Sequence, residues 1–456
     1  MTATKTQIRD FTTGNITQQL IVFAWPLFLS NLLQVVYNMV DMIVVGKVLG
    51  KAGLSAVAVG GDVSHFLTFV SMGFASAGQV IIARYIGAKQ RDKIGTFVGT
   101  MSSFLLVCAM ALSCAGLLCQ DILLDLMNTP QEAYSGALSY STVSMTGLVF
   151  IYGYNIVSAI LRGMGDSKHP FIFISIAAVL NLLLDLLFVV GFHWGAGGAA
   201  LATVISQAVS FISCVIFLSK NREQFHLNVQ RRDFLHWNRE MLGELIRLGT
   251  PMAIKSASIQ ISKLFVNSWI NSYGVAVSAF AGIAHKVANI SNLISNAMNT
   301  AGSTMVGQNI AAGEFERVKK ILFAIARITL SIAVIMTIVL WMFPEQIFGL
   351  FTEPGDVEVL SIAVGYVPIA ALLFFGSALR AVMNALINGS GNHRINFLTA
   401  ILDGIVLRIG LAILFGLVFD MKHYGFWLGD ALAGFTPFWI GLTFYFTGLW
   451  KKGKKV

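Results

Sequence analysis

Apolar stretches close to 20 residues long recur along almost the entire chain, and they constrain its fold more than any other feature. About 20 consecutive apolar residues are needed for a helix to cross ~30 Å of hydrocarbon. Stretches this long, uncharged and rich in glycine indicate helices in lipid. The spans are expected at residues 18–46, 54–83, 96–119, 137–161, 171–190, 196–219, 245–273, 277–308, 318–341, 360–386, 395–416 and 424–448. The expected fold class is an all-α integral membrane protein with 12 transmembrane helices.

Composition and charge support a membrane protein and exclude other classes. Of the 456 residues, 56% are hydrophobic and only 12% charged, so a soluble fold would expose too much apolar surface. The net charge of +9 does not indicate a nucleic-acid partner, because most Lys and Arg fall on one predicted side. This positive-inside bias predicts a multi-pass protein of the cell membrane with both termini cytoplasmic. The four cysteines lie within spans and show no metal or disulfide spacing.

The chain consists of two similar halves. The most polar internal segment, 220–244, divides the spans six and six. It predicts an N-terminal lobe at 1–219, a cytoplasmic linker at 220–244 and a C-terminal lobe with a basic tail at 245–456.

Motifs repeat between these halves at an offset of about 225 residues. Trp25-Pro26 matches Thr250-Pro251, and Leu161–Lys168 matches Ile387–Arg394. Six spans per half is an even number, so both halves run in the same direction and a pseudo-two-fold axis lies along the membrane normal. Several transporter folds share this parallel-repeat arrangement and place their pathway between the halves.

Two carboxylates stand within otherwise apolar spans, Asp41 in the first and Asp185 in the fifth. A charged side chain in hydrocarbon is costly and marks a functional site by default. Both spans run from inside to outside, and each aspartate lies about 8 Å below the outer end at ~1.5 Å per residue. Equal depth is what a shared proton or cation site requires.

Other polar residues lie at or near the same level. Asn181 and Tyr37 stand one turn below the two aspartates, and Thr203 in the sixth span reaches a similar depth. Asn155 on the fourth span is a further candidate. Two close carboxylates cannot both stay ionised cheaply in a low dielectric, so the pair could take up a proton. With Asn181 and Thr203 supplying neutral oxygens, it could instead hold Na⁺.

Several motifs together carry a family resemblance that covers the chain end to end. They are Asp10-Phe11-Thr12-Thr13-Gly14-Asn15-Ile16, Trp25-Pro26, Val36-Tyr37-Asn38-Met39-Val40-Asp41, Leu161-Arg162-Gly163-Met164-Gly165-Asp166 and Gly307-Gln308-Asn309. In order and spacing the chain resembles the multidrug and toxin extrusion (MATE) family. The resemblance implies a secondary antiporter that alternates between inward- and outward-open states and exchanges protons or sodium for organic compounds.

The resemblance is to the branch of the family with acidic residues in the N-terminal lobe. In that branch, Asp41, Asn181, Asp185 and Thr203 occupy the positions of the ion site. The other branch keeps carboxylates on the seventh and tenth spans, where this chain has cationic residues instead. The basic candidates of the C-terminal lobe are Lys263 and Arg380 on those spans and Arg408 on the eleventh. They could pair with Asp403, snorkel, or favour an anionic or zwitterionic substrate.

Two further patterns could carry chemistry. Asp62 and His65, three residues apart on the second span, form a possible secondary proton relay. Gly163–Asp166 matches a Gly-x-Gly-Asp protease pattern, but its repeat partner carries Asn392 in place of the carboxylate. We interpret it as a helix–helix turn and expect no enzyme activity.

The leading functional hypothesis is therefore an ion-coupled exporter of amphipathic small molecules. The alternative is a lipid or lipid-linked-saccharide flippase of the same wider superfamily, which would explain the basic C-terminal lobe. We expect no cofactor and no structural metal beyond the coupling ion, H⁺ or Na⁺. The expected partners are a small organic substrate and the lipid bilayer, and we expect a monomer.

Overall fold

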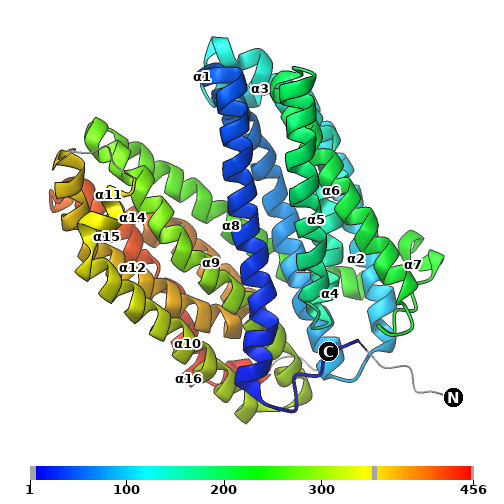
Figure 1. Ribbon diagram of the computed structural model, residues 1–456. Helices are drawn as coiled ribbons and strands as arrows, with labels where there is room; N and C mark the ends of the chain where they lie inside the picture. Colours follow the sequence, from blue (N-terminus) through cyan, green and yellow to red (C-terminus); the bar gives the residue numbers. More distant parts are fainter. Residues whose placement is uncertain (1–6, 352–356, 453–456) are drawn as a thin grey trace. The chain divides into compact units, whose positions relative to one another are not determined.

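In the computed structural model, residues 7–351 and 357–452 are described, and they form helices and turns without a β-strand. The chain divides into two compact units. We call unit 1 the part made of Met1–Asp10 and Trp25–Ala253, and unit 2 the part made of Phe11–Ala24 and Ile254–Val456. Both units are built almost entirely from long helices (Figure 1).

Unit 1 is built around α6, which packs against α3, α4 and α5, while α2 packs on α3, α4 and the short α7. Small residues allow this close packing: a Cβ on Gly147 would lie 2.3 Å from a methyl group of Val204. The helices are α1 (Ile16–Gly87), α2 (Asp92–Leu126), α3 (Gln131–Thr146), α4 (Leu148–Gly163), α5 (Lys168–Asp185), the π-helix η1 (Leu186–Gly191), α6 (Gly195–Lys220), α7 (Arg231–Leu235) and α8 (Arg239–Asn271). The start of α1, up to Ala24, and the part of α8 from Ile254 onward belong to unit 2.

Unit 2 is built around α12, which packs along α9 and α10 and also contacts α15 and α16. Its aromatic core includes Phe280, Tyr366 and Trp427. The remaining helices are α9 (Val275–Ala312), α10 (Phe315–Met342), α11 (Pro344–Gly349), α12 (Val357–Gly389), α13 (His393–Ile401), η2 (Leu402–Val406), α14 (Leu407–Ile413), η3 (Leu414–Val418), α15 (Lys422–Ala433), α16 (Thr436–Phe446) and η4 (Leu449–Lys452).

Each of the twelve predicted spans falls on helical segments of the structure. Seven helices of the described residues are long and apolar enough to cross a membrane, and the pair α3 and α4, bent by 49°, makes an eighth. The predicted spans 18–46 and 54–83 share the 72-residue α1, which breaks at Gly50 (φ 67°, ψ −160°). The other predicted spans fall on α8, α9 and the α15–α16 pair.

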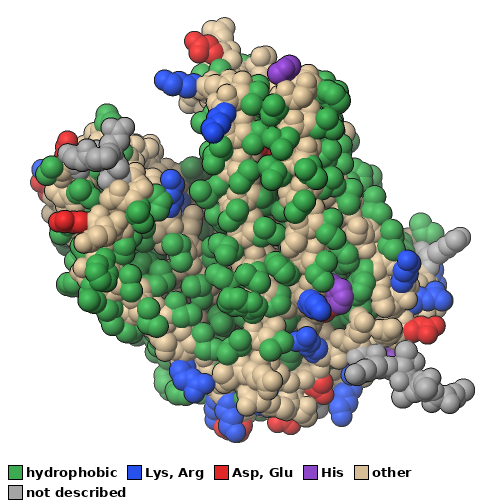
Figure 2. All heavy atoms as spheres, viewed as in Figure 1, with side chains coloured by type: hydrophobic (Ala, Val, Ile, Leu, Met, Phe, Trp, Pro, Cys, Tyr) green, Lys and Arg blue, Asp and Glu red, His purple; other side chains and the backbone are tan. Residues whose placement is uncertain are grey.

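The surface of α5 is apolar where the helix faces outward and polar where it faces inward. Val179 and Leu183 are 63% and 58% exposed, whereas Asn181 and Asp185 are 3% and 0% exposed. Figure 2 shows hydrophobic side chains along this face of unit 1. A helix with this pattern is suited to lipid as its solvent, because the exposed side chains contact hydrocarbon and the polar ones satisfy each other.

The predicted helix–helix turn is confirmed, and it occurs in both halves. Gly165 and Gly391 have φ values of 86° and 67°, a left-handed conformation that glycine adopts without strain. A Cβ on Gly163 or on Gly389 would lie 2.8 Å from a backbone carbonyl oxygen of a neighbouring helix. Both glycines of the motif are therefore needed for backbone geometry, which accounts for their repetition.

Asp166 and Asn392 cap the helix that follows each turn. Asp166 Oδ1 accepts hydrogen bonds from the backbone N–H groups two and three residues further on, at 3.0 and 3.1 Å. Asn392 Oδ1 accepts the equivalent pair, both at 3.2 Å. Since a carboxylate and an amide oxygen cap equally well here, the acid at position 166 is explained by structure.

The compact units divide the chain differently from the lobes predicted at 1–219 and 245–456. Residues 11–24 group with unit 2, where Phe11 hydrogen-bonds Gln308 and Arg317. The predicted linker 220–244 groups with unit 1, where α7 packs on α2. The lobe boundaries remain a prediction, and their ends at 1–6 and 453–456 lie outside the described residues.

Candidate functional site

Asp41 and Asp185 face each other inside unit 1. Asp185 is fully buried at the end of α5, and Asp41 is partly buried in the first span of α1. The two carboxyl groups lie within hydrogen-bonding reach of each other. Ionised carboxylates only accept hydrogen bonds, so a bond between them forms only when one of the two carries a proton. No donor among the described residues reaches the buried Oδ1 atom of either side chain.

The backbone changes its winding directly after Asp185. The α-helical bonding of α5 gives way to the π-helix η1, so the carboxylate lies where the helix widens. Short π-helical segments occur frequently at functional sites. The same feature recurs in unit 2, where the π-helix η2 contains the buried Asp403.

Asn181 connects the aspartate pair to Thr203 on α6. With its amide oriented to satisfy both neighbours, Asn181 donates to Asp185 Oδ2 at 3.3 Å and accepts from the backbone N–H of Thr203 at 3.2 Å. Thr203 also donates to the carbonyl of Ala199 at 3.2 Å. The structure thus brings four of the predicted residues together.

Two tyrosines lie within electrostatic range of the aspartates. Tyr37, predicted from its spacing on α1, interacts with both carboxyl groups. Tyr140 on α3 interacts with the same two groups and with Tyr37. Tyr140 was missed by the sequence analysis. Its position could have indicated it, because Tyr140 carries a hydroxyl group and lies only a few residues from the outer end of span 137–161, near the predicted depth of the aspartate pair.

The other N-terminal candidates do not join this cluster. Asn155 instead donates to Ser71 Oγ at 3.2 Å, which ties α4 to the second span of α1. Asp62 and His65 are both exposed, and among the described residues no hydrogen bond or ion pair joins them. The charge of His65 nevertheless acts on Asp62, and a relay through these two residues stays a prediction.

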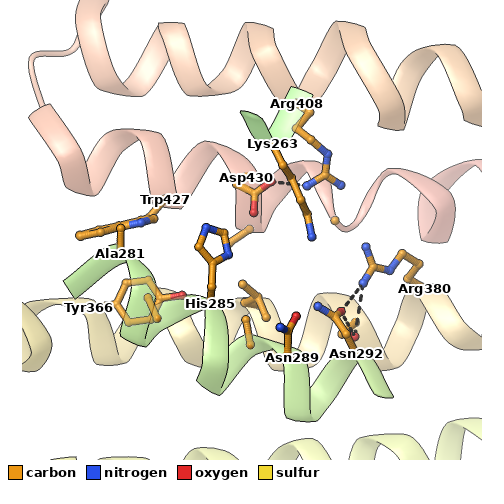
Figure 3. A pocket seen from close by; sticks show the side chains of 16 residues that line it. Lys263, Ala281, His285, Asn289, Asn292, Tyr366, Arg380, Arg408, Trp427 and Asp430 are labelled. Atoms are coloured by element: carbon orange, nitrogen blue, oxygen red, sulfur yellow. Dashed lines mark hydrogen bonds and ion pairs between the residues drawn. The ribbon is translucent and has the colours of Figure 1, made fainter. Parts of the chain in front are cut away.

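The basic candidates of unit 2 surround one cavity (Figure 3). Arg408 forms ion pairs with Asp403 at 2.9 Å and with Asp430. The predicted pairing with Asp403 is thus present, whereas Asp430 was not anticipated. Arg380 donates to Asn292 Oδ1 at 2.8 Å. Lys263 lines the same cavity, and no carboxylate of the described residues forms an ion pair with it.

One charged contact lies at the end of the second span, outside the apolar segments. Arg84 forms an ion pair with Glu244 at 3.2 Å, and Tyr85 donates to the same carboxylate at 3.3 Å. Burial and the negative charge of Glu244 raise the pKa of Tyr85 above its usual range. The described residues contain no group of three His, Cys, Asp or Glu side chains arranged to hold a metal ion.

Comparison with other proteins identifies relatives along the full length. The chain is 28% identical over 447 residues to a Bacillus subtilis protein named "Probable multidrug resistance protein YpnP", covering 98% of each chain. It is 24% identical to "Multidrug export protein MepA" of Staphylococcus aureus over 405 residues, covering 88% of each.

Solved structures of MATE proteins share the fold. An outward-facing multidrug resistance MATE family transporter superposes with a TM-score of 0.89 at 22% identity, over 98% of this chain and 99% of the other. A MATE protein in complex with MaL6 gives a TM-score of 0.90 at 22% identity, over 98% and 100%. The fold is therefore the all-α membrane architecture of twelve transmembrane helices in two lobes.

The family model MatE matches this chain twice, over residues 26–187 and 251–414. The two matches begin 225 residues apart (251 minus 26), which is the predicted offset between the halves. Together they cover most of the sequence. The chain therefore belongs to the MatE family and is a multi-pass membrane transporter rather than an enzyme.

Proposed function

We propose that this transporter exports amphipathic organic compounds in exchange for protons, and that the Asp41–Asp185 pair is the coupling site. The observation that carries the proposal is the close approach of the two buried carboxyl groups, which can share a proton at this separation. We place the protein in the cell membrane as a monomer with both termini cytoplasmic.

Coupling needs a group whose proton affinity differs between the two conformations of the transporter. An ion that binds both states equally shifts no equilibrium. Two acids in contact suit this role, because small changes in their separation or in water access alter the cost of losing the shared proton. Asn181 and Thr203 hold Asp185 in place and supply its neutral neighbours.

Sodium is the second candidate for the coupling ion. The oxygens of Asn181 and Thr203 lie beside the pair and are ligands suited to a hard cation. The close approach of the two carboxyl groups, however, already fits a shared proton without a bound cation, and this favours the proton.

The names of the relatives favour an organic substrate. The Bacillus subtilis and Staphylococcus aureus proteins carry multidrug resistance and export names over nearly the whole chain length. The flippase alternative rests only on the basic residues of unit 2. One of those residues, Arg408, already pairs with Asp403 and Asp430 and so needs no lipid headgroup as its counter-charge.

The experiment is transport by purified protein in proteoliposomes, with the pH and sodium gradients imposed separately. A fluorescent organic cation such as ethidium serves as the substrate. We expect a pH gradient alone to drive its movement, and a sodium gradient alone to leave it at the rate of protein-free vesicles. If only the sodium gradient drives ethidium movement, the coupling ion is sodium rather than a proton. If neither gradient drives it, the antiport proposal is contradicted.

A further inference from the structure

The cavity inside unit 2 has a volume of about 50 Å³. This is several times the ~10–15 Å³ that one water molecule needs. Side chains from α8, α9, α12, α14 and α15 line it (Figure 3). It is large enough for a small polar group and is distinct from the aspartate pair of unit 1.

Cations outnumber carboxylates around this cavity. Both nearby carboxylates, Asp403 and Asp430, form ion pairs with Arg408. Lys263 and Arg380 are left without an ion pair to a carboxylate among the described residues. The ring of His285, which also lines the cavity, forms its hydrogen bond with the neutral Asn267 Oδ1 at 2.9 Å.

The two remaining cations point into the same space. Figure 3 shows the Lys263 ammonium group and the Arg380 guanidinium group approaching each other across the cavity. Arg380 is held in position by Asn292 Oδ1 at 2.8 Å and Ser377 Oγ at 3.4 Å, which are both neutral acceptors. The charge of Asp430, which pairs with Arg408, also acts on Lys263, so three cations share two carboxylates here. Excess positive charge inside a transmembrane unit is costly.

We propose that this cavity is a substrate subsite that binds the anionic oxygen group of an amphipathic compound, such as a carboxylate, between Lys263 and Arg380. The anion supplies the missing counter-charge, and a guanidinium group is suited to bind both oxygens of a carboxylate. Trp427 and Tyr366 on the cavity wall offer apolar contact area for the body of the molecule. This inference rests on the proposed transport function and extends its substrates to anionic or zwitterionic compounds.

The test is direct binding by the purified full-length protein in a non-ionic detergent, measured by isothermal titration calorimetry. The probes are naproxen, which is a naphthyl carboxylate, and its uncharged primary amide. We expect naproxen to bind about tenfold or more tightly than the amide. Lys263→Gln and Arg380→Gln should each remove most of that difference while leaving the affinity for the amide unchanged.

Lys255→Gln is the matched control. Lys255 is on the same helix, α8, but it donates to Asn384 Oδ1 at 2.7 Å and does not line the cavity. It should retain the preference for naproxen, and Arg380→Lys should recover part of it. Equal binding of naproxen and its amide by the unaltered protein would overturn the inference, and this comparison needs no variant to fold.

A competition arm identifies the source of the anionic group. Displacement of naproxen by dihexanoyl phosphatidic acid supports the anion site and extends it to lipid phosphates, whereas a lack of displacement supports it for soluble carboxylates alone. Binding needs no gradient, so this assay separates the two proposals. A protein that binds naproxen but shows no gradient-driven transport would contradict the antiport and leave the subsite standing.

Discussion

A residue's depth in the membrane can be calculated from the sequence, but its direction around the helix axis cannot. The rise per residue placed Asp41 and Asp185 at one level, and the structure brings their carboxyl groups into contact. Asn155 was a further candidate whose depth the spacing fixes less well, and its side chain turns to Ser71. Tyr140 was missed because its approach to the pair depends on how α3 packs against α6.

Asn181 should set the pH at which the aspartate pair releases its proton. Its amide donates to Asp185 Oδ2 and so favours the ionised form. In Asn181→Ala this donor is lost, the pair keeps its proton to higher pH, and the pH of half-maximal transport should rise by about one unit. Proteoliposome uptake measured over a pH series checks this, with Asn155→Ala as a control that should not shift the midpoint.

The helical elements follow from the sequence more reliably than their interruptions. Each predicted span corresponds to a helix because an apolar segment in lipid must satisfy its own backbone hydrogen bonds. The segment 47–53, expected as a loop, continues the helix up to a break at one residue, Gly50. Neither this continuation nor the π-helices η1 and η2 has a pattern in hydropathy, because both depend on local packing.

The glycine motif between α4 and α5 should be needed for stability rather than for transport. Gly165→Ala forces a side chain into a left-handed conformation (φ 86°) at a cost of about 1–2 kcal/mol. We expect its melting temperature in detergent to fall. Gly243→Ala is the matched control, because Gly243 lies within α8 with open space around its Cα and the change should stabilise by about 0.5–1 kcal/mol. Equal melting temperatures for the two variants would contradict this interpretation of the turn.

At the scale of the whole molecule, the internal repeat was predicted from a few short motifs and the family match confirms its offset. The offset was visible because the turn residues, Gly165 and Gly391, are constrained by backbone geometry in both halves. The candidate site residues do not repeat, because unit 1 carries paired acids whereas unit 2 carries a basic cavity. A repeat therefore predicts the architecture but not the chemistry of each half.

The topology prediction is tested by labelling single cysteines in intact cells, on a background in which the four native cysteines are replaced. Glu358 is exposed at the start of α12, and Glu223 is exposed after α6. The charge bias predicts that a membrane-impermeant maleimide labels Glu358→Cys from outside. Glu223→Cys should react only after the cells are permeabilised. The reverse pattern would invert the topology.

The most direct test of the central claim is pH-gradient-driven efflux by Asp41→Asn and Asp185→Asn in proteoliposomes. Each amide keeps the shape and most hydrogen bonds of the acid but cannot exchange a proton, so transport should fall to the rate of protein-free vesicles. Asp166→Asn is the control and should transport normally, because Asn392 already caps the equivalent helix. If either variant of the pair, folded and inserted, exports substrate at the unaltered rate, the coupling site is not the Asp41–Asp185 pair.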